Sequence, residues 1–92
     1  MKTKQRVFWV IGKNYCIRTV TMMQVGTLVG IDEHEILLEN CAWVADSGRF
    51  AVFLKTGSVS EVEPFPDGLV AIGRGSLVDA CVWTHLLFRE QK

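Results

Sequence analysis

The sequence predicts a mostly β fold, a small bent antiparallel sheet or barrel that carries one short helix over about residues 47–55. Short β-branched and aromatic runs alternate with Gly, Asp and Pro turn signals along the chain, which is typical of short strands. Gly26 and Gly30 lie inside the apolar run 25–31, where glycines usually mark a bulge or strong curvature. Helix start and stop signals flank the segment after Asp46.

The strand pattern can be followed in order along the chain. Gly12-Lys13-Asn14 ends the first run, and the tetrad 32–35 makes a polar turn. The long run 35–44 that follows alternates uniformly, with Ile36 on one face and Cys41 on the other, and both faces are partly covered. The last segment, 77–88, fits either a helix or a strand, and its Val, Cys, Trp and Thr content favours a strand. The pattern therefore predicts strands over residues 7–11, 15–22, 25–31, 35–44, 58–65, 69–72 and 77–88, and Gly73-Arg74-Gly75 interrupts the last two.

The predicted helix is short. Asp46-Ser47-Gly48 supplies N-cap residue types before an aromatic and aliphatic stretch, and Lys55-Thr56-Gly57 supplies a basic last turn followed by glycine. These signals allow about two turns.

Length and composition indicate a single domain over residues 1–92. The chain has 92 residues, of which 49% are hydrophobic and 22% charged. A domain this small covers its apolar surface poorly, so oligomerisation would help it. Charged residues interrupt every apolar stretch before membrane-spanning length, and the basic start does not lead into a signal-peptide pattern, so we expect a cytoplasmic protein with no membrane partner.

The charge is balanced in total and uneven along the chain. Residues 1–18 carry five Lys or Arg and no acid, residues 19–48 carry five acids and no Lys or Arg, and the formal net charge is zero. Nucleic-acid binding is disfavoured because it requires clustered positive charge, which only the first segment supplies. A basic strand paired beside an acidic one would equally explain the pattern.

The residue types that carry catalysis are sparse. Three cysteines without CxxC spacing and two histidines give neither a disulfide framework nor a zinc pattern, so we expect buried reduced thiols. Glu61 and Glu63 share a strand face, which is more typical of a solvated surface than of an acid and base pair. The sequence thus predicts a protein that is not an enzyme and that has no metal or cofactor.

Two short motifs resemble those of Sm-like proteins. Val25-Gly-Thr-Leu-Val-Gly-Ile-Asp32 with Glu35-Ile-Leu-Leu-Glu39 resembles the first motif, and Ile72-Gly-Arg-Gly-Ser-Leu-Val78 resembles the second. The resemblance implies a five-stranded bent barrel that assembles into rings. The family's Asn in the turn has no counterpart in residues 32–35, and residues 45–57 form an insertion between the motifs. These departures argue against RNA binding more than against the fold.

A longer set of segments is similar to a group of small uncharacterised proteins of tailed phages and prophages. It comprises residues 42–50, 60–68, Gly73-Arg-Gly75 and Trp83-Thr-His85. Phage proteins of this size include virion ring components and oligomeric sponges that sequester nucleotide immune signals, such as cyclic ADP-ribose isomers or cyclic dinucleotides. The resemblance therefore implies an anti-defence or an assembly role in the host bacterial cytoplasm.

The residue types that a nucleotide site needs are an aromatic plane, a guanidinium and a carboxylate. The residues that we expect to bind the ligand are Trp43, Asp46, Ser47, Arg49, Arg74, Trp83 and His85. Structural roles remain open for all of them except Arg74: a helix cap for Asp46 or Ser47, a surface ion pair of Arg49 with Glu61 or Glu63, core packing for the tryptophans and a structural hydrogen bond for the histidine. The resulting hypothesis is a homo-oligomer that sequesters a small nucleotide; the alternatives are a phage structural or assembly protein and an Sm-like RNA-binding ring.

Overall fold

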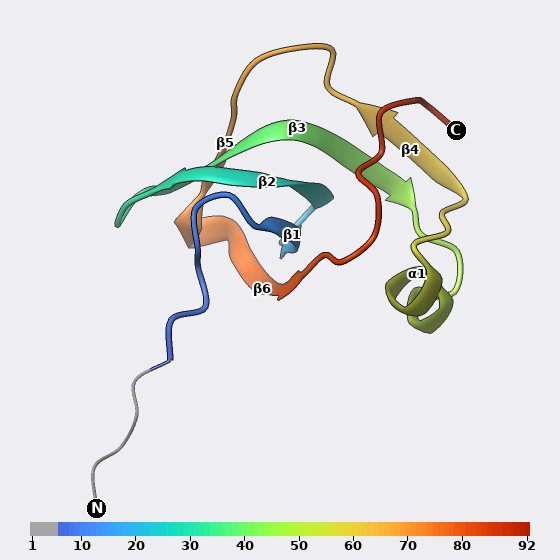
Figure 1. The fold of residues 1–92 in the computed structure, drawn as a ribbon, viewed down its shortest axis with the longest axis horizontal. Helices are drawn as coiled ribbons and strands as arrows, with labels where there is room; N and C mark the ends of the chain where they lie inside the picture. Colours follow the sequence, from blue (N-terminus) through green and yellow to red (C-terminus); the bar gives the residue numbers. More distant parts are fainter. Residues whose placement is uncertain (1–5) are drawn as a thin grey trace, which may run out of the picture.

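The structure is a computed structural model that describes residues 6–92 (Figure 1). One bent antiparallel sheet of six strands, which does not close, carries one short helix, so the predicted fold class is confirmed. The elements are β1 (Asn14–Thr19), β2 (Met23–Ile31), β3 (Glu35–Asp46), α1 (Phe50–Thr56), β4 (Glu61–Pro64), β5 (Val70–Gly73), a 3-10 turn η1 (Arg74–Ser76) and β6 (Leu77–Val82). No helix in residues 6–92 is long and apolar enough to cross a membrane.

Strands β1, β2 and β3 form an antiparallel meander that bends at β2. The β2–β3 register shifts between Val25 and Thr27 and again between Leu28 and Gly30, beside the two glycines that predicted curvature. A Cβ on Gly26 would lie 3.1 Å from the Glu39 carbonyl oxygen and 3.2 Å from the Cys41 Cα. The strands approach too closely there for an ordinary side chain, which explains the glycine.

A bulge in β3 changes which side chains face the core. Val25 and Thr27 of β2 pair with Ala42 and Glu39 of β3, so β3 contains one extra residue between these two pairs, which is a β-bulge. Asn40 lies in this bulge with a φ of 50°, in the left-handed region. The uniform alternation predicted for 35–44 is therefore wrong at Cys41, which is buried in the same core cluster as Ile36 rather than on the opposite face.

The long strand β3 pairs with two successive strands on its second edge. β5 pairs with residues 35–38 and β4 with residues 42–46. After β5, η1 carries the chain across the bend to β6, which pairs with β1 (Figure 1). The sheet order is β4-β3-β2-β1-β6, and the core lies in two clusters inside the bend.

The strands predicted over 15–22 and 58–65 are shorter in the structure, as β1 and β4. Three further predicted elements differ from it. Residues 7–11 form no strand, because the Tyr15 hydroxyl donates to the Phe8 carbonyl (2.7 Å) and accepts from the Val10 N–H (2.8 Å) in place of a neighbouring strand. β6 ends at Val82 because Trp83 turns into the core, where its indole N–H donates to the Leu86 carbonyl at 3.1 Å. The third difference is the helix.

The helix α1 starts three residues later than predicted and ends where its stop signal indicates. Asp46 still belongs to β3, where it pairs with Glu61, and Gly48 has a φ of 71° that excludes helical geometry there. At the other end, Gly57 has a φ of 77° and donates its N–H to the Phe53 carbonyl. The predicted C-terminal glycine cap is confirmed.

Candidate functional site

The structure divides the seven predicted ligand residues among three places. Trp43, Asp46, Ser47 and Arg49 lie around the end of β3, Trp83 and His85 lie under α1, and Arg74 lies at the opposite end of β3.

Asp46 and Ser47 organise the turn between β3 and α1 rather than the helix. One Asp46 carboxylate oxygen accepts the Gly48 N–H at 2.8 Å, and the Ser47 hydroxyl donates to the Gly48 carbonyl at 2.9 Å. The helix N-cap is Arg49, which makes no side-chain capping bond. The alternative that either residue caps the helix is therefore wrong, and both polar side chains are committed to the turn.

Trp43 and Arg49 keep solvent-exposed side chains near this turn. The Trp43 side chain is 38% exposed and lines a shallow apolar hollow of about 180 Å³ with Met22, Phe65 and neighbouring residues. Within residues 6–92 the Arg49 guanidinium makes no ion pair, so the expected pairing with Glu61 or Glu63 is absent there. An aromatic face and a cation are thus available on one end of the sheet.

Trp83 and His85 both contact the helix α1. Trp83 is only 3% exposed and its ring packs against Phe53 at 4.8 Å between centroids. The His85 Nε2 atom lies 2.7 Å from the Leu54 carbonyl oxygen, so that nitrogen carries the proton and donates. The contacts match the alternatives that the sequence left open, which are core packing for Trp83 and a structural hydrogen bond for His85.

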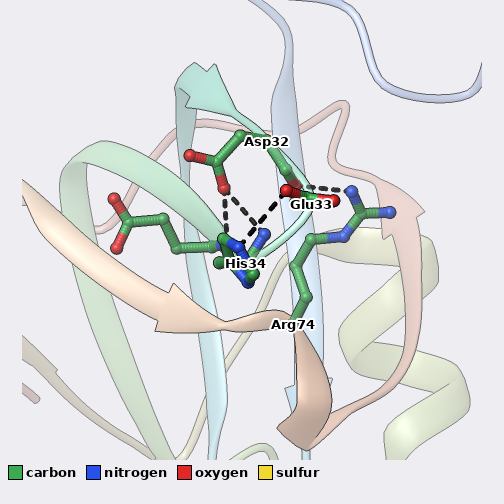
Figure 2. Close-up of polar contacts among 5 residues, drawn as sticks. Asp32, Glu33, His34 and Arg74 are labelled. Atoms are coloured by element: carbon green, nitrogen blue, oxygen red, sulfur yellow. Dashed lines mark hydrogen bonds and ion pairs between the residues drawn. The ribbon is translucent and has the colours of Figure 1, made fainter.

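Arg74 holds the turn between β2 and β3 (Figure 2). Its Nη1 donates to the Asp32 carbonyl at 2.6 Å, while an Asp32 carboxylate oxygen accepts the backbone N–H groups of Glu35 (2.9 Å) and His34 (2.8 Å). These two bonds lower the pKa of Asp32, because they favour the charged carboxylate. Arg74 and Arg49 lie at opposite ends of β3, so one chain does not bring them together on one phosphate.

A polar pocket of about 260 Å³ lies where the sequence predicts no site. Glu39 and Asn40 enter it from the β3 bulge, Phe65 to Leu69 from the β4–β5 connection, and Arg89 from the C-terminal segment. The Arg89 Nη1 donates to the Asn40 side-chain oxygen at 2.8 Å. These segments are distant in sequence, and only the Asp67-Gly68 turn was visible as a motif.

Three strands of the described residues have a single partner strand. The outer edge of β4 is bonded to the C-terminal segment, because Val62 and Lys92 exchange two backbone hydrogen bonds of 2.9 Å, so the open edges are those of β5 and β6. β6 pairs only with β1 and β5 only with β3.

In an antiparallel ladder, successive residues direct their N–H and C=O groups to opposite edges of the strand. The Trp83 N–H donates to the Asn14 carbonyl beside β1 (2.8 Å), so the N–H and C=O groups of Val82 and Ala80 point away from β1. In the same way, the Arg74 N–H donates to the His34 carbonyl next to β3, so the N–H and C=O groups of Ala71 point away from β3.

Residues 6–92 contain no group of three His, Cys, Asp or Glu side chains that could hold a metal ion. Burial raises the pKa of the Cys16 and Cys41 thiols to about 12, so neither supplies a thiolate near neutral pH.

Comparison with protein-family models, curated proteins and solved structures finds no match to this chain.

Proposed function

We propose that this chain is a non-enzymatic homo-oligomer whose subunits join edge to edge, with β5 of one copy pairing with β6 of the next. The observation that carries this proposal is the pair of open edges at two different places on one bent sheet. Two different edges make a head-to-tail contact, which closes into a ring when the rotation allows it. The exposed Val78 (60%) and Val82 (41%) give the β6 edge an apolar surface to bury. The resemblance to Sm-like motifs supports the same arrangement.

For the ligand, we infer a small nucleotide that the oligomer sequesters in the bacterial cytoplasm without converting it. The resemblance to small phage proteins supplies this class. Trp43 offers an exposed ring on which a base can stack, and Arg49 offers a guanidinium without an ion-pair partner in the described part of the chain. Arg74 would come from another subunit, because it lies at the far end of β3 in its own chain.

A phage structural or assembly role is the second candidate function. It is favoured by the large apolar side chains left at the surface, which fit contacts with other proteins. The exposed residues are Val7, Phe8, Val10, Ile11, Val20, Met22, Trp43, Phe50, Val52, Leu69, Val78, Val82 and Leu86. An RNA-binding ring has less support, since the formal net charge is zero.

Native mass spectrometry tests assembly and ligand in one experiment. The protein is purified from bacteria that express active cyclic-nucleotide or TIR-type immune synthases. A stable oligomer that carries a nucleotide-sized mass, released intact on denaturation, is the expected result. An oligomer with no added mass would overturn sequestration of those signals and favour the assembly role, and a bare monomer would overturn the ring.

A matched pair of valine variants tests the edge contact. Val82→Lys places a charge on the β6 edge, whereas Val52→Lys places one at a similarly exposed valine of α1 (41% against 45% exposed). We expect the first to shift the oligomer to monomer at unchanged circular dichroism and the second to leave it assembled. Equal assembly of the two variants would contradict pairing through β6.

A further inference from the structure

We propose that the polar pocket between the β3 bulge, the β4–β5 connection and the C-terminal segment holds one nucleoside monophosphate unit of the sequestered ligand. This inference rests on the proposed function and gives it a site other than the one the sequence predicted. The pocket brings together an aromatic ring, a guanidinium and carboxylates, from Phe65, Arg89, Glu39 and Asp67. These are the groups that recognise a base, a phosphate and sugar hydroxyls.

One hydrogen bond from the β3 bulge anchors the guanidinium at the pocket. Asn40 has a φ of 50°, a conformation that Asn tolerates better than most residues, and the bulge in β3 enforces it. The Asn40 side-chain oxygen accepts one Arg89 N–H at 2.8 Å, which holds the guanidinium at the pocket. Arginine has five N–H donors, so others remain for an anionic ligand group.

The balance of charge in the pocket selects the ligand. Glu39 and Asp67 carry two negative charges against the single positive charge of Arg89. Inorganic phosphate would place its negative charge beside two carboxylates and could offer them only its own P–OH groups as hydrogen-bond donors. A ligand with one phosphate and neighbouring hydroxyl donors satisfies both signs, because carboxylates accept hydrogen bonds from ribose hydroxyls. The chemistry therefore fits a nucleoside monophosphate better than free phosphate or a polyanion.

The size and surroundings of the pocket agree with one nucleotide unit of a larger signal. Its volume of about 260 Å³ lies below the roughly 300–1,000 Å³ of sites that enclose a drug-sized molecule. Phe65 and Pro66 line both this pocket and the apolar hollow that contains Trp43. A base leaving the polar pocket over Phe65 would therefore meet the exposed Trp43 ring.

Isothermal titration of the purified oligomer with AMP, adenosine and inorganic phosphate tests the site. We expect AMP to bind at least about tenfold more tightly than either of the other two, since it alone offers both the phosphate and the hydroxyls. Arg89→Gln should remove most of the preference for AMP over adenosine. Lys13→Gln, an exposed cation outside the pocket, is the control and should bind AMP like the unmodified chain.

A second variant keeps the test independent of folding. Asn40→Gly retains the left-handed backbone while removing the amide that anchors Arg89, so it should unfold no more easily and yet bind AMP several-fold more weakly. Normal AMP affinity in both pocket variants, with binding lost in Trp43→Ala, would overturn the pocket and leave the sequestering function standing. An intact oligomer that binds none of the three probes would overturn the pocket, and the co-expression experiment would then judge the function separately.

Discussion

Gly57 combines two local requirements at one position. Its φ of 77° ends α1, and a Cβ placed there would lie 2.7 Å from the Cβ of His85. The same close approach allows His85 to donate to the Leu54 carbonyl and so to join the C-terminal segment to the helix. Because glycine has no side chain at this position, the C-terminal segment can pack directly against the end of α1.

Gly57→Ala is expected to lower the free energy of unfolding by about 2 kcal/mol or more, because it adds left-handed strain and a clash with a packed ring. Gly75→Ala is the control, since a Cβ there meets nothing within 4 Å and its φ is not positive. Urea denaturation of both variants measures the difference. Equal stabilities would mean that the His85 segment moves away at no cost.

The buried thiols predict how stability depends on alkaline pH. Burial raises the pKa of Cys16, with the facing Cys81 adding to the shift, and burial raises that of Cys41; both reach about 12 from an ordinary value of 9.0. The folded chain then holds protons that the unfolded chain releases, so this stabilisation is present below pH 9 and is lost as the pH rises toward 12.

We expect the free energy of unfolding to be smaller at about pH 10.5 than at about pH 8. Lysine and tyrosine also titrate in this range, so the decisive comparison is with a Cys16→Ala/Cys41→Ala chain, in which the drop should be smaller. An identical drop in both chains would show that the thiols do not contribute.

At the scale of elements, β2 and the turn into β3 are the parts most predictable from sequence. The glycines of 25–31 and the polar tetrad 32–35 are local signals that indicate curvature and a turn before any partner strand is known. Residues 7–11 have equally strong strand propensity, yet they form no strand, because pairing depends on whether a partner edge lies nearby. Propensity is local, and partner availability is a property of the whole fold.

The candidate site was less predictable for the same reason. Local signals marked Asp46 as a helix cap, whereas it ends β3 and organises the turn that follows. Trp83 is buried by an aromatic cluster with Phe53 and Phe88 that no spacing reveals. The pocket at Arg89 depends on a bulge, a loop and a distant C-terminal segment meeting in space. The sequence therefore indicates which residue types suit a ligand, but it does not predict which of them lie together in space.

Tyr15 carries the attachment of residues 7–11 to the sheet. Tyr15→Phe removes both hydrogen bonds while keeping the ring packed against Phe8 and Trp9. We expect a loss of about 1–2 kcal/mol and faster proteolytic cleavage before residue 12. Limited proteolysis followed by mass spectrometry measures this, and cleavage at an unchanged rate would show that the aromatic contacts suffice.

At the scale of the whole molecule, the bent sheet has two open edges, on β5 and β6. If those edges pair, folding is linked to assembly, and stability increases with protein concentration. We expect the midpoint of thermal unfolding to rise by about 5 °C or more over a roughly 100-fold increase in concentration. Val82→Lys should remove this dependence, and a concentration-independent midpoint for the unmodified chain would contradict edge pairing.

The pairing of β1 with β6 also determines the order in which the chain can fold. Residues 14–19 meet residues 77–82, so the sheet is completed only when segments from distant parts of the chain come together. The β1–β2–β3 meander can form from neighbouring residues, whereas closing the loop to β6 carries a large entropic cost and slows the rate-limiting step. During synthesis, the early strands therefore emerge from the ribosome before β6 exists, with the edge of β1 uncovered and open to wrong partners for that interval.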